Sequence, residues 1–332
     1  MQQQADSDTN RNMSEKALSA PALAEIRAAA GVLAPYIIRS PLLKLKSGGR
    51  SSDIYLKLEN LQTIGAFKGR PMGAVLLNAN PAALQNGVYT ASSGNAGLGL
   101  AWMASELGHA ATVYAPGTAP AEKIAAVRRF GAKIESLSDS EWWQIIENSG
   151  HPDDPGLYVD AVRDPAAMAG NGTIGLEMFE QAPDVDTVIV PFGGGGLTCG
   201  IAAAMRALKP DTRIIVAECD AAAPLTAALQ AGQPVTVEVK PSFVSGAGAS
   251  SVLAEMWPLV NELVDDTLVV PVADVANTIK MLFERDKIIV EGAGAIAVAA
   301  VSATRREFGK SVCVVSGGNI DSAAMAAILK PD

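Results

Sequence analysis

The sequence predicts an α/β fold built on a mainly parallel sheet. Short runs rich in β-branched residues alternate with alanine-rich segments of helical periodicity along the 332 residues. Such alternation is typical of a sheet with helices on both faces. The strand candidates are continuously apolar, as parallel strands buried on both faces are. No low-complexity linker divides the chain, so we expect a second, smaller α/β domain to be inserted in the first.

The expected elements follow one another in a regular order. Strands are expected at residues 54–59, 87–92, 110–116, 133–137, 157–162, 187–192, 213–218, 268–272 and 311–316. Helices are expected at residues 98–108, 120–131, 201–209 and 275–288. The strand-helix series at 79–162 predicts the small domain there, and residues 19–78 and 163–332 form the large domain. Residues 1–18 are polar, so we expect a disordered tail.

Composition restricts the class of protein and its partners. Hydrophobic residues make up 49% and charged residues 18%, which indicates a globular protein. The net charge of −9 argues against a nucleic acid or an anionic membrane as the main partner. The apolar runs are too short to cross a bilayer, and the polar N-terminus is no signal peptide. Three widely spaced cysteines indicate free thiols in a reducing compartment, the cytoplasm.

A run of four glycines, Gly193–Gly196, follows the strand expected at 187–192. Glycine lets the backbone turn sharply and brings its N–H groups close to a ligand. Together with the N-terminus of the next helix, such a loop forms a phosphate site. A tight structural turn is the alternative, but it needs only one or two glycines. We therefore predict an anion site here.

The kind of phosphate stays open at this point. The Walker pattern is absent, because no Gly-Lys-Ser/Thr follows. Gly194 and Gly196 match the start of the dinucleotide pattern, although its third glycine, Gly200, comes one place late. Glu218 ends the next strand, near the place of a ribose-binding acid. An NAD-dependent oxidoreductase is therefore an alternative.

Two further loops leave strands with hydroxyl groups. Ser92, Ser93, Gly94 and Asn95 lead from one strand into a helix, and Ser316 follows another strand. Free N–H groups and hydroxyls at the start of a helix suit a carboxylate. An ordinary serine N-cap is the alternative for the first of these loops.

Lys68 opens a helix shortly after the strand at 54–59, in the stretch "LQTIGAFKGRPMG". A lysine at a helix N-terminus is electrostatically disfavoured. Burial and the helix dipole would lower its pKa and free the amine for attack. A surface lysine is the alternative.

Taken together, these stretches resemble the fold-type II pyridoxal-phosphate (PLP) enzymes, most closely the serine/threonine dehydratase and serine racemase branch. "KLENLQTIGAFKGR" is similar to the family's cofactor-lysine motif, "SSGN" to its substrate-carboxylate loop and "GGGGL" to its phosphate cup. "AGNGTIGLEMFEQ" and "EGAGAIAVAA" match two further blocks, so the resemblance covers nearly the whole chain.

The resemblance implies a role for each matching residue. Lys68 holds PLP as a Schiff base and later moves protons, Phe67 packs beside the ring, and Ser316 faces the pyridine nitrogen. Asn95 bonds the ring hydroxyl. The phosphate is held by Gly193, Gly194, Gly195, Gly196 and Leu197. The substrate carboxylate is received by Ser92, Ser93, Gly94, Ala96 and Gly97.

The implied activity is that of a lyase. We expect dehydration and deamination of a β-hydroxy amino acid to a 2-oxo acid and ammonia by a cytoplasmic homodimer. Serine, threonine or a bulkier analogue such as phenylserine would be the substrate. The alternatives are a racemase, in which Ser93 is a second acid/base opposite Lys68, and a non-catalytic amino-acid-binding module. Neither His109 nor His151 lies in a site motif, so we expect lysine to carry the proton.

The sequence departs from the family pattern on the substrate side. Ala96 stands where the family usually has histidine, and "SFVSGAGAS" at 242–250 replaces an acidic stretch. Both changes favour a larger or more apolar β-substituent, and no additional cation is evident. Some members bind a divalent cation through a residue like Glu218 and an aspartate six positions later, but here that position is Pro224. We therefore expect no metal site.

Overall fold

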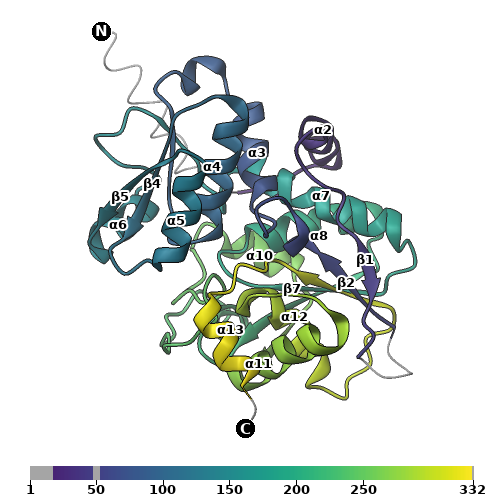
Figure 1. Ribbon diagram of the computed structural model, residues 1–332. Coiled ribbons are helices and arrows are strands. Elements are labelled where there is room, and N and C mark those ends of the chain that lie inside the picture. The colour runs from purple at the N-terminus through teal and green to yellow at the C-terminus, as the bar shows by residue number, and fades with distance from the viewer. Residues whose placement is uncertain (1–17, 48–52, 331–332) are drawn as a thin grey trace.

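The computed structural model describes residues 18–47 and 53–330, which form two sheets and their covering helices (Figure 1). The larger sheet has six strands in the order β1-β2-β10-β7-β8-β9, all parallel except for the pair β1–β2. Its strands are β1 (Leu42–Lys44), β2 (Ile54–Leu58), β7 (Thr187–Pro191), β8 (Arg213–Cys219), β9 (Asp266–Val270) and β10 (Ser311–Val315).

The smaller sheet has four parallel strands in the order β5-β4-β3-β6. They are β3 (Val88–Ala91), β4 (Ala111–Pro116), β5 (Lys133–Leu137) and β6 (Leu157–Tyr158). Helices α4 (Asn95–Leu107), α5 (Ala121–Arg129) and α6 (Asp139–Glu147) alternate with these strands along the chain. The sheet lies wholly between residues 88 and 158, while the domain bounds 79–162 stay a prediction.

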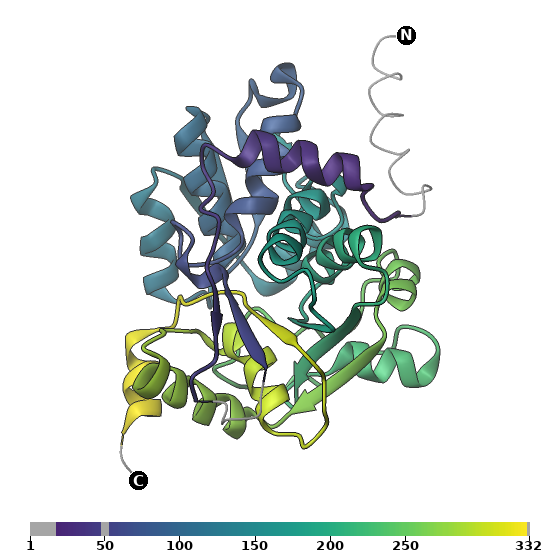
Figure 2. The ribbon, with the colours of Figure 1, turned by 90° about the vertical axis from the view of Figure 1, so that its right-hand side faces the viewer.

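Helices surround the six-stranded sheet, and some of them pack on other helices. They are α2 (Leu23–Leu33), α3 (Gly69–Asn78), α7 (Pro165–Gln181), α8 (Gly196–Leu208), α9 (Pro224–Ala231), α10 (Trp257–Leu263), α11 (Val272–Met281), α12 (Gly292–Ser302) and α13 (Ser322–Leu329). Figure 2 shows α2 lying across the helices that pack behind the sheet, and it contacts α7, α3 and α8. Short helical turns are η1 (Glu59–Leu61), η2 (Pro81–Leu84) and the π-helical η3 (Leu282–Asp286).

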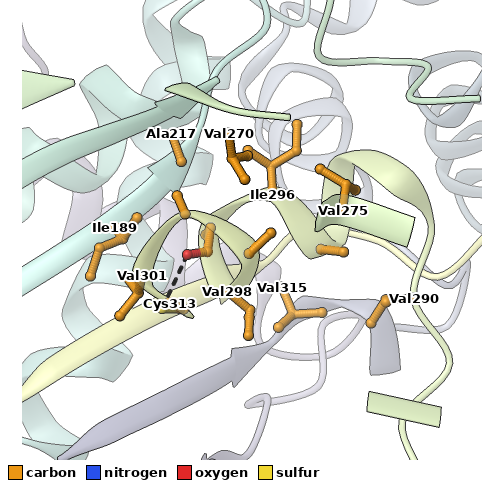
Figure 3. Close-up of a cluster of buried hydrophobic side chains, with 14 of the residues drawn as sticks. Ile189, Ala217, Val270, Val275, Val290, Ile296, Val298, Val301, Cys313 and Val315 are labelled. Carbon is orange, nitrogen blue, oxygen red and sulfur yellow. Dashed lines mark hydrogen bonds between the residues drawn. The ribbon is translucent and has the colours of Figure 1, made fainter. Parts of the chain in front are cut away.

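Helix α12 is the centre of one face of the core. Every residue from Gly292 to Val301 is buried, and apolar side chains from α12 meet those of β7, β8 and β10 (Figure 3). A helix that is apolar on all sides requires such complete enclosure. Each large aliphatic side chain buried there contributes about 1.5–3 kcal/mol. Cys313 of β10 donates weakly to the Ala297 carbonyl at 3.6 Å, and burial raises the pKa of its thiol.

The predicted α/β class and the parallel sheets are confirmed. The sequence missed β1, which has three residues and pairs antiparallel at the edge. The strand expected at 268–272 ends at Val270, because Pro271 has no N–H for the ladder and caps α11 instead. The strand expected at 157–162 stops at Tyr158, after which Asp160 folds the chain into a turn.

The tail predicted for residues 1–18 falls outside the described residues except for Leu18, which packs against the core. All three cysteines are buried and unpaired, as expected. Among the helices of residues 18–47 and 53–330, none combines the length and the apolar character needed to span a membrane.

Candidate active site

Three of the predicted loops meet at one edge of the six-stranded sheet. Lys68, Gly193 and Ser316 follow strands β2, β7 and β10, and β10 lies between the other two. The carboxyl ends of parallel strands lie at the same edge, which is where ligands bind in such sheets. The order of the strands therefore brings the lysine, the glycine loop and the serine together.

Backbone bonds fix Lys68 beside Ser316. The Phe67 N–H donates to the Ser316 carbonyl at 3.0 Å, and the Gly318 N–H donates to the Gly65 carbonyl at 2.8 Å. Gly65 has a φ of +71°, which disfavours any residue with a side chain. These two bonds hold the lysine loop against the loop after β10, so the position of Lys68 follows from main-chain geometry.

The Lys68 amine is partly buried and unpaired. Its Nζ has no hydrogen bond or ion pair with any residue of 18–47 or 53–330, and it lies 4.8 Å from the centroid of the Phe67 ring. Burial lowers the pKa of Lys68 to about 8, and the negative charge of Asp160 partly opposes this shift. An amine with such a pKa is partly neutral near pH 7 and can act as a nucleophile or a base.

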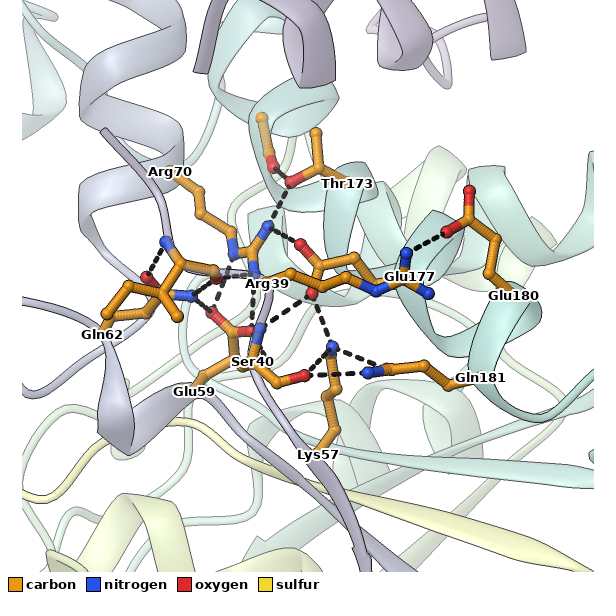
Figure 4. Close-up of polar contacts among 12 residues, drawn as sticks. Arg39, Ser40, Lys57, Glu59, Gln62, Arg70, Thr173, Glu177, Glu180 and Gln181 are labelled. Atoms are coloured by element: carbon orange, nitrogen blue, oxygen red, sulfur yellow. Dashed lines mark hydrogen bonds and ion pairs between the residues drawn. The ribbon is translucent and has the colours of Figure 1, made fainter. Parts of the chain in front are cut away.

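A buried cluster of charges anchors the helix that begins at Lys68 (Figure 4). Arg70 is 1% exposed and donates twice to Glu59 at 2.8 Å and once to Glu177 at 2.8 Å. Lys57 completes the cluster, with Nζ 2.5 Å from Glu177. Burial lowers the pKa of Lys57, whereas Glu59 and Glu177 outweigh burial and raise the pKa of Arg70. These buried ion pairs therefore fix the position of the first turn of α3.

The glycine loop forms a cradle at the N-terminus of α8. Gly195 has a φ of +97° and caps the helix, whose first N–H groups have no intrahelical acceptor. A Cβ on Gly194 would lie 2.7 Å from the Val162 side chain, and one on Gly193 would lie 2.8 Å from the Gly246 carbonyl. The buried Thr198 Oγ1 has no partner within the described ranges. This donor set fits a phosphate group.

A chain of amides links the second predicted loop to this edge. Asn319 donates from Nδ2 to Asn95 Oδ1 at 2.8 Å, and Asn95 Nδ2 donates to Glu291 Oε1 at 2.6 Å. Glu291 is 6% exposed, and burial raises its pKa to about 7. Neither Glu291 nor Asn319 was predicted as a site residue, although Glu291 opens the stretch "EGAGAIAVAA".

The serine loop precedes α4 as predicted. The Gly94 N–H donates to Ser92 Oγ at 3.1 Å, and Ser93 remains partly exposed. Gly97 is buried, and a Cβ there would lie 2.8 Å from Val113. Ala96 packs against the apolar cluster around α4. The loop therefore has a packing reason for at least one of its glycines, and its role in binding a carboxylate stays a prediction.

Sequence reasoning missed a cation beside this loop. Lys123 Nζ lies 3.8 Å from the place that a Cβ on Gly94 would take, and it donates to Ser245 Oγ at 2.9 Å. A hollow of about 340 Å³ opens here, lined by Gly94, Asn95 and Lys123 among others. Lys123 comes from α5, so only the fold brings it to the loop after β3.

The residues of the nicotinamide alternative have structural roles. The buried Glu218 carboxylate accepts from the N–H groups of Leu225 at 2.9 Å and Thr226 at 2.8 Å, which start α9. Gly200 packs directly against the backbone of α7. Within residues 18–47 and 53–330, no group of three His, Cys, Asp or Glu side chains is placed to hold a metal ion.

The fold, with a glycine cradle that fits a phosphate at the carboxyl edge of its sheet, is that of an α/β protein with a site for a phosphate-bearing ligand. The family model of pyridoxal-phosphate dependent enzymes matches residues 33–317. The chain belongs to this family, and its cofactor is pyridoxal phosphate. The predictions of the family, the fold and the cofactor are confirmed, and the NAD alternative is wrong.

Relatives and solved structures agree with this assignment. The chain is 39% identical over 282 residues to an L-threonine ammonia-lyase of Geobacter sulfurreducens, covering 83% of this chain and 70% of that protein. It is 34% identical to a putative threonine dehydratase of Sinorhizobium fredii, covering 92% and 94%. Maize serine racemase superposes with a TM-score of 0.85 at 30% identity, covering 93% and 97%. A threonine deaminase of T.th. superposes with a TM-score of 0.83 at 31% identity, covering 91% of this chain and 99% of that chain. The predicted lyase class is confirmed by these relatives.

Proposed function

We propose that the protein dehydrates and deaminates a β-hydroxy amino acid of the threonine or serine type to a 2-oxo acid and ammonia. One observation carries the proposal: beside Ser316, at the sheet edge that also carries the glycine cradle, Lys68 presents an amine of lowered pKa that has no partner among the described residues. The relatives named as threonine ammonia-lyases and dehydratases support this choice of substrate.

The residues present fit pyridoxal phosphate. The amides of Gly193–Leu197 and the unpartnered Thr198 hydroxyl would hold the phosphate, and Lys68 would hold the aldehyde carbon. Phe67 and Ser316 would flank the ring, and Asn95 would bond its hydroxyl. When bound, the cofactor supplies an electron sink for the bonding pair released at the substrate Cα.

The protein's own residues orient the substrate and move the proton. The N-terminus of α4, with Ser92, Ser93 and Gly94, orients the substrate carboxylate. Lys68 removes the Cα proton, which an amine with a pKa of about 8 can do near neutral pH. Ser316 offers a neutral hydroxyl at the edge of the sheet, so it does not add a charge there. The β-hydroxyl leaves with the proton that Lys68 took up, as water, and hydrolysis of the enamine product then gives the 2-oxo acid and ammonia.

A racemase is the second candidate. Ser93 lies in the loop at the start of α4, so it could act as an acid opposite Lys68. The similarity to maize serine racemase supports this possibility. Chiral analysis of the recovered substrate distinguishes the two, because a lyase leaves the configuration of unreacted substrate unchanged.

We also propose a cytoplasmic homodimer. Three buried, unpaired thiols fit a reducing compartment. Among the exposed large hydrophobic side chains, Val32, Ile38, Leu43 and Leu61 fall close together in the sequence and would supply contact area for a second copy. Light scattering of the purified protein gives the assembly size.

A panel of β-hydroxy amino acids, assayed for 2-oxo acid formation, tests the function. We expect holoenzyme to release equal amounts of 2-oxo acid and ammonia from at least one member, and the Lys68→Ala variant to release none. Bound cofactor without turnover of any member would favour an amino-acid-binding module. Inversion of the substrate without ammonia release would favour the racemase.

A further inference from the structure

A hollow of about 450 Å³ lies beside the serine loop, on the side of α6. Its walls include Ser93, Pro116, Ala119, Pro120, Trp142 and Trp143. They come from the loop after β3, the end of β4 and the segment that follows it, and the first turns of α6. Apolar groups thus form most of a concavity whose edge is a residue of the predicted carboxylate loop.

The two tryptophans are the main feature of this hollow. Their ring centroids lie 6.1 Å apart with planes inclined by 50°. Trp143 is 40% exposed and donates from Nε1 to Glu147 at 2.7 Å. Trp142 Nε1 is buried and has no acceptor among the residues that the structure describes. Large apolar surfaces left open to solvent, together with an unpartnered indole N–H, are typical of ligand sites.

The charge of the walls excludes one class of substituent. Among the described residues, no lysine or arginine lines the hollow, and its one ionisable side chain is Asp139. That carboxylate lies in the first turn of α6 and accepts from Thr118 Oγ1 at 3.4 Å. A second carboxylate on the substrate would be repelled here, whereas an uncharged ring would bury apolar area.

We infer that this hollow, defined by Trp142 and Trp143, is the subsite for an aromatic or similarly bulky apolar group on the β-carbon of the substrate. The inference rests on the proposed function, because it is the substrate carboxylate at Ser92–Asn95 that would bring the β-carbon to Ser93. An apolar cavity of about 150 Å³ already holds benzene, so the available volume is sufficient for a phenyl group. Aromatic pairs also prefer the tilted, edge-to-face contacts that two inclined indoles offer.

Kinetics with paired substrates test the inference. The ratio of kcat/KM for β-phenylserine to that for threonine is measured in the wild-type holoenzyme, in Trp142→Ala and in Trp142→Phe. We expect the ratio to exceed one in the wild type and to fall at least about tenfold in Trp142→Ala, the loss expected for a pocket contact of this size. Trp142→Phe, which keeps an aromatic ring, should retain most of the ratio. A ratio that is below one in the wild type, or that does not change in Trp142→Ala, contradicts the inference.

A binding measurement separates failure of the subsite from failure of the proposed function. Quenching of tryptophan fluorescence in the wild-type protein gives the Kd of 3-phenylpropionate and of propionate, which differ only in the ring. We expect at least about tenfold tighter binding of 3-phenylpropionate. Equal binding of both acids, with threonine turned over, would overturn the subsite and leave the lyase standing. Preferential binding of the aryl acid without turnover of any β-hydroxy amino acid would support the subsite and overturn the lyase.

Discussion

Replacing Arg70 with methionine is expected to destabilise the protein strongly. The guanidinium is 1% exposed and Glu59 is fully buried, with two bonds of 2.8 Å between them. The change leaves Glu59 as an unpaired buried charge, apart from donors at Ser40 and Gln62. Loss of one partner of a buried ion pair costs about 3–5 kcal/mol. Because Glu177 keeps Lys57 at 2.5 Å, we expect the lower end of that range, about 3 kcal/mol.

Urea unfolding of the cofactor-free protein, followed by circular dichroism, measures this loss. Arg39→Met is the matched control, because the Arg39–Glu180 pair is 2.9 Å apart but more than half exposed on both sides. Exposed pairs contribute little to stability. Arg70→Lys should fall between the wild type and Arg70→Met, since lysine keeps the charge without the planar fork. Equal destabilisation by Arg70→Met and Arg39→Met would refute the reasoning.

Two further outcomes follow from the site. Burial raises the pKa of Glu291 from 4.5 to about 7, so its stabilising effect is complete below pH 4.5 and is lost as the pH rises through 7. Relative to Glu291→Gln, the cofactor-free wild type should therefore lose up to about 3 kcal/mol of its free energy of unfolding between pH 4.5 and 8. Urea unfolding at a series of pH values measures this loss, and parallel curves of unfolding free energy against pH would contradict the prediction. In Gly196→Ala, the new Cβ would lie 2.7 Å from the Val162 carbonyl, which should weaken cofactor binding at least about tenfold on titration of the apoprotein. Gly31→Ala, with no atom within 4 Å of its Cβ, is the control and should bind normally.

The sheets could be predicted because their strands are continuously apolar. Strands β7 and β10 are buried at every position, and such runs bounded by glycine or proline leave few alternatives to a buried parallel strand. The edge strand β1 could not be found in this way, because its three residues are half-exposed and end in a lysine. Its place depends on pairing with β2, which is a tertiary contact.

The candidate site could be predicted where a motif lies at the carboxyl end of a strand. Ser316 follows β10 directly, the run Gly193–Gly196 begins shortly after β7, and Lys68 follows β2 after the short helix η1. The order of the strands then places these residues at one edge. Asp160 and Lys123 carry no local signal, because each acts on a residue from another element. Trp142 and Trp143 carry no functional signal in the sequence either, because only folding brings the loop after β4 beside them. Long-range proximity is what one sequence cannot supply.

The attachment point of the cofactor tests the central claim most directly. Burial lowers the pKa of two lysines of the described residues, Lys57 and Lys68. Lys57 Nζ is held by Glu177, Gln181 and the Ser40 carbonyl, whereas Lys68 Nζ is free of such partners within residues 18–47 and 53–330. Borohydride reduction of the holoenzyme followed by peptide mass analysis should place the pyridoxyl label on Lys68 alone. A label on Lys57 or Lys123, or an unlabelled Lys68 in active enzyme, would contradict the account.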